Sequence, residues 1–99
     1  MFYYKIHEGR AGYLLAACDK SICGKKLDNK GVEFYVNPRF YKDKETTKAG
    51  IRKLFSMSSS ANLVGKNIVK FALELGVIDK SSIININGIP HAQMVAITI

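Results

Sequence analysis

The chain has few cysteines and histidines, which limits the metal and redox chemistry that its sequence can support. Its two cysteines, Cys18 and Cys23, are separated by four residues rather than by the two of a CxxC redox motif. A disulfide framework usually needs more cysteines, and the two histidines, His7 and His91, do not complete a zinc motif with them. We therefore expect two reduced, mostly buried thiols, and neither a metal nor another cofactor.

Long apolar segments are also absent. No run approaches the roughly 18 apolar residues that cross a bilayer. The opening MFYYKIHEGR lacks the basic and apolar regions of a signal peptide. With 99 residues, of which 47% are hydrophobic, and with neither repeats nor low-complexity linkers, the chain can build one core. We expect a single domain over residues 1–99, located in the cytoplasm and not in a membrane.

Acidic residues are scarce, and the resulting positive charge is unevenly distributed. The chain has 15 Lys and Arg against 8 Asp and Glu, a net charge of +7. Nearly all of the excess lies in residues 20–53, which contain ten basic and four acidic residues. Such a segment attracts polyanions in a salt-dependent way, but positive charge can also serve only to keep a protein soluble. The charge alone leaves both interpretations open.

The first third of the chain has the pattern of β-strands. Residues 2–8 and 13–19 are rich in aromatic, β-branched or apolar side chains, and the GRAG sequence between them favours a tight turn. Residues 21–31 are interpreted as a polar connection. Residues 32–36 alternate in polarity like a half-buried strand, which Asn37-Pro38 ends.

The middle of the chain has helical periodicity. Apolar residues recur at helical spacing within residues 39–57, where Asp43 or Thr46 is the expected N-cap. Residues 60–76 predict a second helix, which Gly76 ends in a left-handed conformation.

The remaining residues complete the predicted fold. Residues 83–99 indicate a strand, an Asn87-Gly88 turn and another strand, with Pro90 at a sheet edge or at the first strand position. The order β-β-β-α-α-β-β predicts an α+β domain in which a mostly antiparallel sheet of about five strands carries two helices on one face. Strands from the two ends of the chain can meet in this sheet, which would bring His7 near His91.

One candidate function is catalysis or small-ligand binding by Cys18, Asn62 and His91. A thiol nucleophile needs a base such as His91 within hydrogen-bond reach, and a polar residue such as Asn62 to orient that base. No GxSxG, HExxH or paired-carboxylate pattern accompanies these residues. Cys18 ends an apolar run, which is typical of a buried, unreactive thiol. We therefore favour a protein without enzymatic activity.

A second candidate function is phosphate binding at a helix start within SSSANLVGK, residues 58–66. Free backbone N–H groups at a helix N-terminus attract anions, but the spacing of a P-loop is absent. The simpler interpretation is that Ser60 or Asn62 caps a helix and that Gly65 allows a close contact between helix and strand.

A third candidate function is nucleic-acid binding, because basic residues of the central segment are interleaved with aromatic ones. This pattern fits phosphate contact combined with stacking, although no RNP, KH or zinc-finger motif is present. Phe40 and Tyr41 are also suited to packing a helix on the sheet, an alternative that the sequence leaves open for both residues. The residues expected to contact nucleic acid are Lys20, Lys25, Lys26, Lys30, Arg39, Tyr41, Lys42, Lys48, Arg52 and Lys53.

The sequence GIPHAQ, residues 88–93, places two polar side chains in an apolar strand. His91 and Gln93 are two residues apart and therefore share one face of the strand. If that face is buried, they must bond to neighbouring groups. If it is open, they form a polar binding surface.

Six short sequences carry a resemblance to a known family. KIHE (5–8), CD (18–19), GK (24–25), FY (40–41), ANLVG (61–65) and GIPHAQ (88–93) occur in this order in the chain. Together they resemble a small archaeal family catalogued as domain of unknown function 424, over the chain from Lys5 to about Val95. The family often has a glycine after FY, where this chain has Lys42-Asp43.

The resemblance implies an archaeal, cytoplasmic, single-domain protein, and it supplies no established reaction. It also suggests a polar patch of family-motif residues: His7, Asp19, Asn62, Gly65, Lys66, His91 and Gln93.

The basic segment with its interleaved aromatic residues predicts a small protein that binds RNA or a ribosomal subunit, and the resemblance to the archaeal family suggests that it belongs to the translation apparatus. It would dock through its central Lys/Arg-rich segment. The alternatives are the enzyme or small-ligand protein using Cys18, Asn62 and His91, and a protein-interaction module for an acidic partner.

Overall fold

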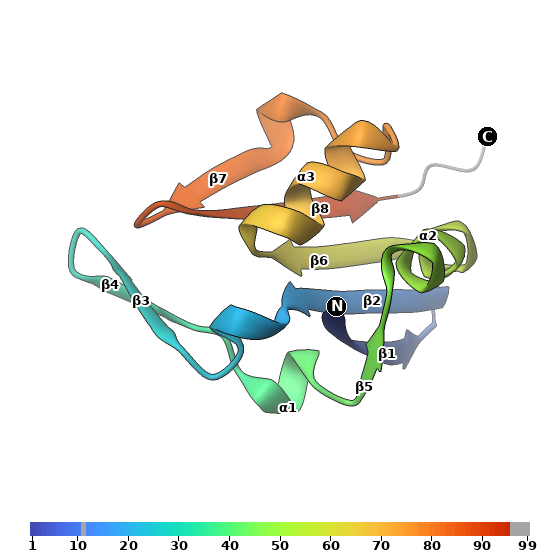
Figure 1. Ribbon diagram of the computed structural model, residues 1–99, viewed down its shortest axis with the longest axis horizontal. Coiled ribbons are helices and arrows are strands. Elements are labelled where there is room, and N and C mark those ends of the chain that lie inside the picture. The colour runs from blue at the N-terminus through green and yellow to red at the C-terminus, as the bar shows by residue number, and fades with distance from the viewer. Residues whose placement is uncertain (11, 96–99) are drawn as a thin grey trace.

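The computed structural model describes residues 1–10 and 12–95. Its main sheet has six strands in the order β5-β1-β2-β6-β8-β7, and every neighbouring pair is antiparallel except β2 and β6 (Figure 1). These strands are β1 (Phe2–Gly9), β2 (Gly12–Asp19), β5 (Lys44–Thr46), β6 (Ser60–Val64), β7 (Ile83–Ile86) and β8 (Ile89–Val95). The predicted α+β class with a mostly antiparallel sheet is confirmed, with one strand more than expected.

The other elements are short. Strands β3 (Lys26–Asn29) and β4 (Val32–Tyr35) form a separate two-stranded hairpin. The helices are α1 (Pro38–Tyr41), α2 (Lys48–Met57) and α3 (Lys66–Glu74), and two 3₁₀ turns are η1 (Lys20–Ile22) and η2 (Lys80–Ser82). None of the helices in the described ranges is long and apolar enough to cross a membrane.

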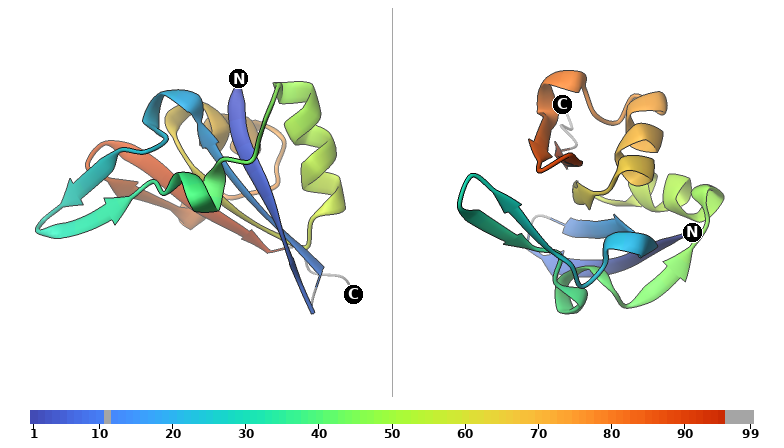
Figure 2. Two further views of the ribbon diagram at one scale, coloured as in Figure 1. Left: turned by 90° about the horizontal axis from the view of Figure 1, so that it is seen from below. Right: turned by 60° about the vertical axis from the view of Figure 1, so that its left-hand side comes forward.

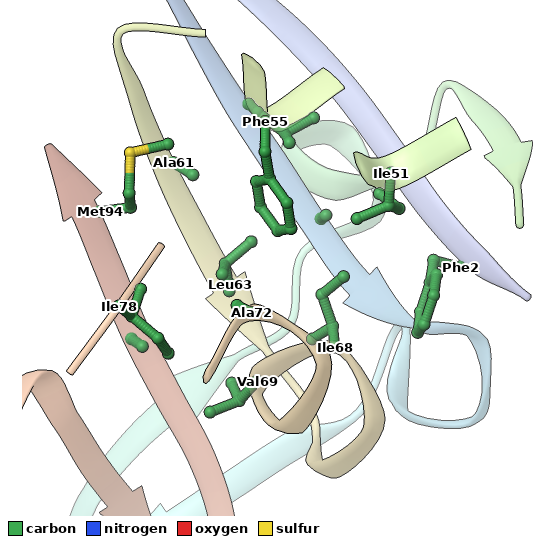
Figure 3. Close-up of a cluster of buried hydrophobic side chains, with 13 residues drawn as sticks. Phe2, Ile51, Phe55, Ala61, Leu63, Ile68, Val69, Ala72, Ile78 and Met94 are labelled. Atoms are coloured by element: carbon green, nitrogen blue, oxygen red, sulfur yellow. The ribbon is translucent and has the colours of Figure 1, made fainter. Parts of the chain in front are cut away.

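Hydrophobic side chains are buried on both faces of the main sheet. On one face, α2 and α3 enclose a core in which Ile51, Leu63 and Ile68 have no exposed surface (Figure 3). This confirms the prediction of two helices on one face. The opposite face is partly covered by η1, the β3–β4 hairpin and α1 (Figure 2). Val36, which follows β4, and Tyr41 of α1 pack in one cluster with Cys18.

The predicted helix over residues 60–76 is wrong in its first part. Residues Ser60–Val64 form β6, and α3 begins only at Lys66. Ala61 and Leu63 face the helix-side core, while Val64 faces the opposite cluster. β6 pairs with β2 on one side and with β8 on the other, so it lies inside the sheet. A short apolar run of this kind is compatible with either helix or strand.

The predicted helix over residues 39–57 is in fact three elements, α1, β5 and α2. The N-cap of α2 is Thr47, whose side-chain oxygen accepts a hydrogen bond from the Gly50 N–H at 3.3 Å, and not Asp43 or Thr46. A Cβ at Gly50 would collide with the Thr46 hydroxyl, because β5 passes close to the first turn of α2. This close approach explains a glycine inside a helix.

The predicted polar connection at residues 21–31 is wrong, since it contains most of η1 and all of β3. The turn to β4 is Lys30-Gly31, with φ of 54° and 85° at the two residues. This left-handed pair is the geometry of a tight hairpin turn, for which lysine is an unusual first residue. The Asp28 carboxylate supports the turn by accepting a hydrogen bond from Gly31 N–H at 3.0 Å.

Other turn predictions are confirmed. Asn87 and Gly88 both have positive φ and join β7 to β8. Gly76 has a φ of 74° after α3, and its N–H donates to the Leu73 carbonyl at 3.1 Å. Residue 11 of the predicted GRAG turn and residues 96–99 of the predicted last strand lie outside the described residues. The position predicted for Pro90 is wrong, because Pro90 is the second residue of β8, and β8 lies between β6 and β7 and is not an edge strand.

Candidate functional site

A polar network lies on the sheet face opposite α2 and α3, which we call the open face. At its centre, the Asn62 Oδ1 accepts a hydrogen bond from the Tyr41 hydroxyl at 2.7 Å and another from the His91 Nε2 at 3.1 Å. Because a carbonyl oxygen only accepts, the Nε2 of His91 carries the proton. The amide of Asn62 is therefore held in one orientation by two donors.

Strand pairing positions this network. Antiparallel pairing of β6 with β8 puts Asn62 opposite Gln93 and Val64 opposite His91. The two-residue period of a strand then places Asn62, His91 and Gln93 on the same face, as their spacing predicts. Gln93 is exposed, whereas Asn62 and His91 are half-buried.

Helix α1 delivers Tyr41 to the same place. The Asn37 side chain caps α1 by accepting a hydrogen bond from the Arg39 N–H at 3.0 Å, and Pro38 occupies the first turn. Tyr41 is buried, so this residue, predicted to contact nucleic acid, instead supports Asn62.

Aromatic contacts extend the network from His7 to Phe34. The His7 ring stacks on Phe40 with centroids 4.6 Å apart, and its Nε2 donates to the Phe40 carbonyl at 2.9 Å. Phe40 meets Tyr41 edge-on at 4.9 Å, and Phe34 meets His91 edge-on at 5.4 Å. His7 and His91 thus share the open face and are linked through α1 and Asn62.

The two side chains that donate to Asn62 are uncharged at pH 7. Burial lowers the pKa of His91 from its ordinary 6.5, so its ring is uncharged. Burial also raises the pKa of Tyr41, which keeps its hydroxyl protonated as a donor.

Cys18 does not meet the needs of the proposed nucleophile. Its side chain is fully buried between the sheet and α1, and burial raises the pKa of its thiol, with the nearby Cys23 thiol adding to the shift. A buried, protonated thiol is unreactive. Cys18 is thus the buried thiol that the sequence predicts, and Cys23 is half-buried; both are free.

Two members of the predicted polar patch form a helix cap. The Asp19 carboxylate accepts hydrogen bonds from the Asn67 N–H at 2.9 Å and from the Ile68 N–H at 2.8 Å, and so caps α3 from the end of β2. Gly65 has a φ of 126°, and a Cβ there would lie 2.5 Å from the Asp19 Cγ. The close contact expected at Gly65 exists, whereas Ser60 and Asn62 lie in β6 and cap no helix. Because Asp19 occupies the anion position of this helix terminus, we assign no phosphate site to it.

The predicted basic residues are divided among three surfaces. Lys20 pairs with the Glu45 carboxylate at 3.0 Å, and Lys20 and Lys42 both lie over the Tyr3 ring. A second group is exposed along η1, the β3–β4 hairpin and α1: Lys25, Lys26, Lys30 and Arg39. The third group, Lys48, Arg52 and Lys53, lies on α2, on the other side of the sheet.

The third group borders a groove beside α3. This groove has a volume of about 570 Å³ and is lined by Lys48, Ala49, Arg52, Lys53, Ser56 and Phe71; we call it the helical groove. The Lys48 ammonium lies 5.5 Å from the centre of the half-buried Phe71 ring. A smaller hollow beside it, of about 200 Å³, is lined in part by Lys48, Lys70 and Phe71.

Sequence reasoning missed Phe71 and Lys70 as candidate binding residues. Phe71 was assigned to the core because of its helical spacing. Lys70 follows Lys66 by four residues, so the two share one face of α3, and this spacing was the available signal.

The chain belongs to the family described as protein of unknown function (DUF424), whose model matches residues 6–97. A crystal structure of an uncharacterised conserved protein from Methanopyrus kandleri has a similar fold. The TM-score is 0.77 at 24% sequence identity, and the alignment covers 94% of this chain and 89% of that chain. Among curated proteins, none matches this chain.

Proposed function

We propose that this member of the DUF424 family is a small RNA- or ribosome-associated binding protein that holds the RNA backbone in the helical groove. The observation that carries this proposal is the clustering of cations from α2 and α3 around Phe71. It revises the docking surface expected from the sequence, because the central basic segment supplies only α2 to this groove.

The charge of the two helices is strongly one-sided. Their sequences contain five basic residues, Lys48, Arg52, Lys53, Lys66 and Lys70, and one acidic residue, Glu74. Lys48 and Arg52 are four residues apart on α2, as Lys66 and Lys70 are on α3. Each pair therefore forms a row along one face of its helix, with Phe71 between the helices.

The chemistry of the groove suits a single-stranded nucleic acid. Lysine and arginine side chains neutralise phosphates, and an aromatic ring offers a stacking surface that accepts any base. The surface around Tyr3 is less suited, because Glu45 already pairs with Lys20. The hairpin surface is less suited as well, because Asp28 and Glu33 lie among its lysines.

The number of cations sets the expected salt dependence. Four cations line the groove and the adjoining hollow, namely Lys48, Arg52, Lys53 and Lys70, and neutralising four phosphates of a single strand gives a log–log slope of affinity against salt of about −2.8. Between 50 and 200 mM salt the affinity should then fall roughly fiftyfold. Removing two of these four cations should reduce the slope to about −1.4.

The test compares two variants that lose the same charge from different surfaces. R52Q/K53Q alters the helical groove, and the matched control K25Q/K26Q alters the β3–β4 hairpin. Binding of a fluorescent single-stranded RNA is measured by anisotropy at several salt concentrations. We expect the groove variant to bind more weakly with a shallower salt slope and the control to bind almost as wild type. Equal losses in both variants, or no loss in the groove variant, would refute the groove as the RNA site.

A ribosomal subunit is a candidate source of this RNA. Sedimentation of a host lysate through sucrose gradients at low and high salt tests this, with R52Q/K53Q beside wild type. We expect wild type to co-sediment with a subunit at low salt only, and the groove variant to stay at the top of the gradient. If an acidic protein binds the groove and RNA does not compete for it, the protein-interaction alternative replaces the RNA proposal.

A further inference from the structure

We propose that the open face is a second binding site, which takes a nucleobase through the outward-facing amide of Asn62, with Gln93 beside it. The site lies across the sheet from the helical groove and uses hydrogen bonds in place of charge. It rests on the proposed function only in that RNA would be one source of the base. A free nucleotide carries the same chemistry.

The amide of Asn62 is a donor fixed in advance. Its Oδ1 is held by Tyr41 and His91, so the Nδ2 group must point away from both. Among residues 1–10 and 12–95, none accepts a hydrogen bond from this Nδ2, and every buried side-chain nitrogen or oxygen has a partner. The Nδ2 therefore reaches the surface, where it can donate to a carbonyl or ring nitrogen of a base without reorganising.

Gln93 supplies a second amide in register. It lies directly opposite Asn62 on β8, shares its face of the sheet, and is exposed. Side chains directly opposite on neighbouring strands have Cβ atoms about 5 Å apart. Two amides at this separation match the width of a base edge, which presents neighbouring donors and acceptors.

Aromatic rings border this position. Phe34 packs edge-on against His91 and Phe40 packs edge-on against Tyr41, which are the two side chains that hold the Asn62 amide, and both phenylalanines are half-buried. Rings that flank hydrogen-bonding groups are the usual means of holding unpaired bases. The basic residues of α2 and α3 take no part in this network, which favours a neutral planar ligand over a phosphate.

The face has room for the rest of a nucleotide. An open groove of about 460 Å³ begins at Ser60, two residues from Asn62 along β6, and is also lined by His7, Leu14 and Arg10. This volume lies within the range of small-ligand sites. A base at Asn62 and Gln93 would place its sugar toward this groove.

The decisive variant is Asn62→Asp, because it keeps the oxygen that accepts from Tyr41 and His91 and replaces only the outward donor. Asn85→Asp is the matched control, since it makes the same substitution at an exposed position of β7 outside the proposed site and keeps the oxygen that accepts a hydrogen bond from the Gly88 N–H. Gln93→Ala is a second variant, at an exposed position where folding is not at risk. Preserved backbone amide spectra establish that each variant is folded.

The measurement is an NMR titration of the ¹⁵N-labelled protein with the four ribonucleoside monophosphates and with single-base hexaribonucleotides. We expect the side-chain amide signals of Asn62 and Gln93 to shift, with binding about tenfold weaker in N62D and several-fold weaker in Q93A, and little changed in N85D. Binding of monophosphates identifies a free nucleotide as sufficient, and binding of hexamers alone identifies RNA as the source. Absence of shifts at both amides, or equal weakening in N62D and N85D, overturns the inference. If hexamer binding is lost in R52Q/K53Q but unchanged in N62D and Q93A, the inference is also overturned, while the proposed function stands.

Discussion

The contact between Asp19 and the first turn of α3 allows a quantitative test of how the fold is held together. Asp19→Ala would leave the N–H groups of Asn67 and Ile68 without their acceptor. The Ile68 N–H is buried and the Asn67 N–H partly so, and an unpaired backbone donor costs about 1–3 kcal/mol depending on its burial. We therefore expect the free energy of unfolding to fall by about 3 kcal/mol, measured by urea denaturation with circular dichroism. A loss below about 1 kcal/mol would refute the assignment of Asp19 as the essential cap.

Gly65 turns this test into a double-mutant cycle. Gly65→Ala would place a Cβ 2.5 Å from the Asp19 Cγ, at a backbone φ of 126°. The collision occurs only when the Asp19 carboxylate is present, whereas the backbone strain of roughly 1–3 kcal/mol remains when Asp19 is replaced. The double variant D19A/G65A should therefore be more stable than the sum of the single effects predicts, by about 1 kcal/mol or more. Additive effects would show that Asp19 and Gly65 are not in contact.

Two further predictions concern titration and reactivity. Burial lowers the pKa of His91 below its value of 6.5 in the unfolded chain, so the unfolded state takes up the proton first as the pH falls. The stability that depends on neutral His91 should therefore be fully present above pH 6.5 and decline below it. Between about pH 7.5 and 5.5, the free energy of unfolding should decline less in His91→Gln than in wild type. An unchanged pH dependence in this variant would contradict the burial of His91. Because Cys18 is fully buried with a raised pKa while Cys23 is half-buried, iodoacetamide should modify Cys23 first, as peptide mass spectrometry of timed samples would show. Comparable rates at the two thiols would contradict the packing of Cys18 under α1.

The elements predicted well are those whose signal is local. Asn87-Gly88 favours a tight hairpin turn because both residues tolerate positive φ, and Gly76 ends α3 for the same reason. The two-residue period of a strand is also local, and it puts His91 and Gln93 on one face without knowledge of any neighbour. Lys30-Gly31 forms the same kind of turn as Asn87-Gly88, but lysine carries no comparable preference, so β3 was missed.

The elements predicted badly are those whose partner is far away in sequence. Nothing within Ser60–Val64 distinguishes a buried strand from a helix start; β2, more than 40 residues earlier in the chain, decides it by parallel pairing. The contiguous basic segment suggested one surface, but the insertion of β5 between α1 and α2 carries its last cations to the other face of the sheet.

The sequence by itself determined the α+β class, the N-terminal and C-terminal hairpins, the basic charge and the membership of a family. These follow from turn chemistry, residue periodicity and composition, which act over a few residues or over the whole chain. Only the tertiary structure decided that Asp19 caps α3, that Tyr41 and His91 meet on Asn62, and that Phe71 lies among cations from two helices. Each of these contacts joins residues that are at least 20 positions apart, and their geometry depends on which strands pair and in which register. A one-residue shift in the pairing of β6 would turn Asn62 into the helix-side core and abolish the open-face network.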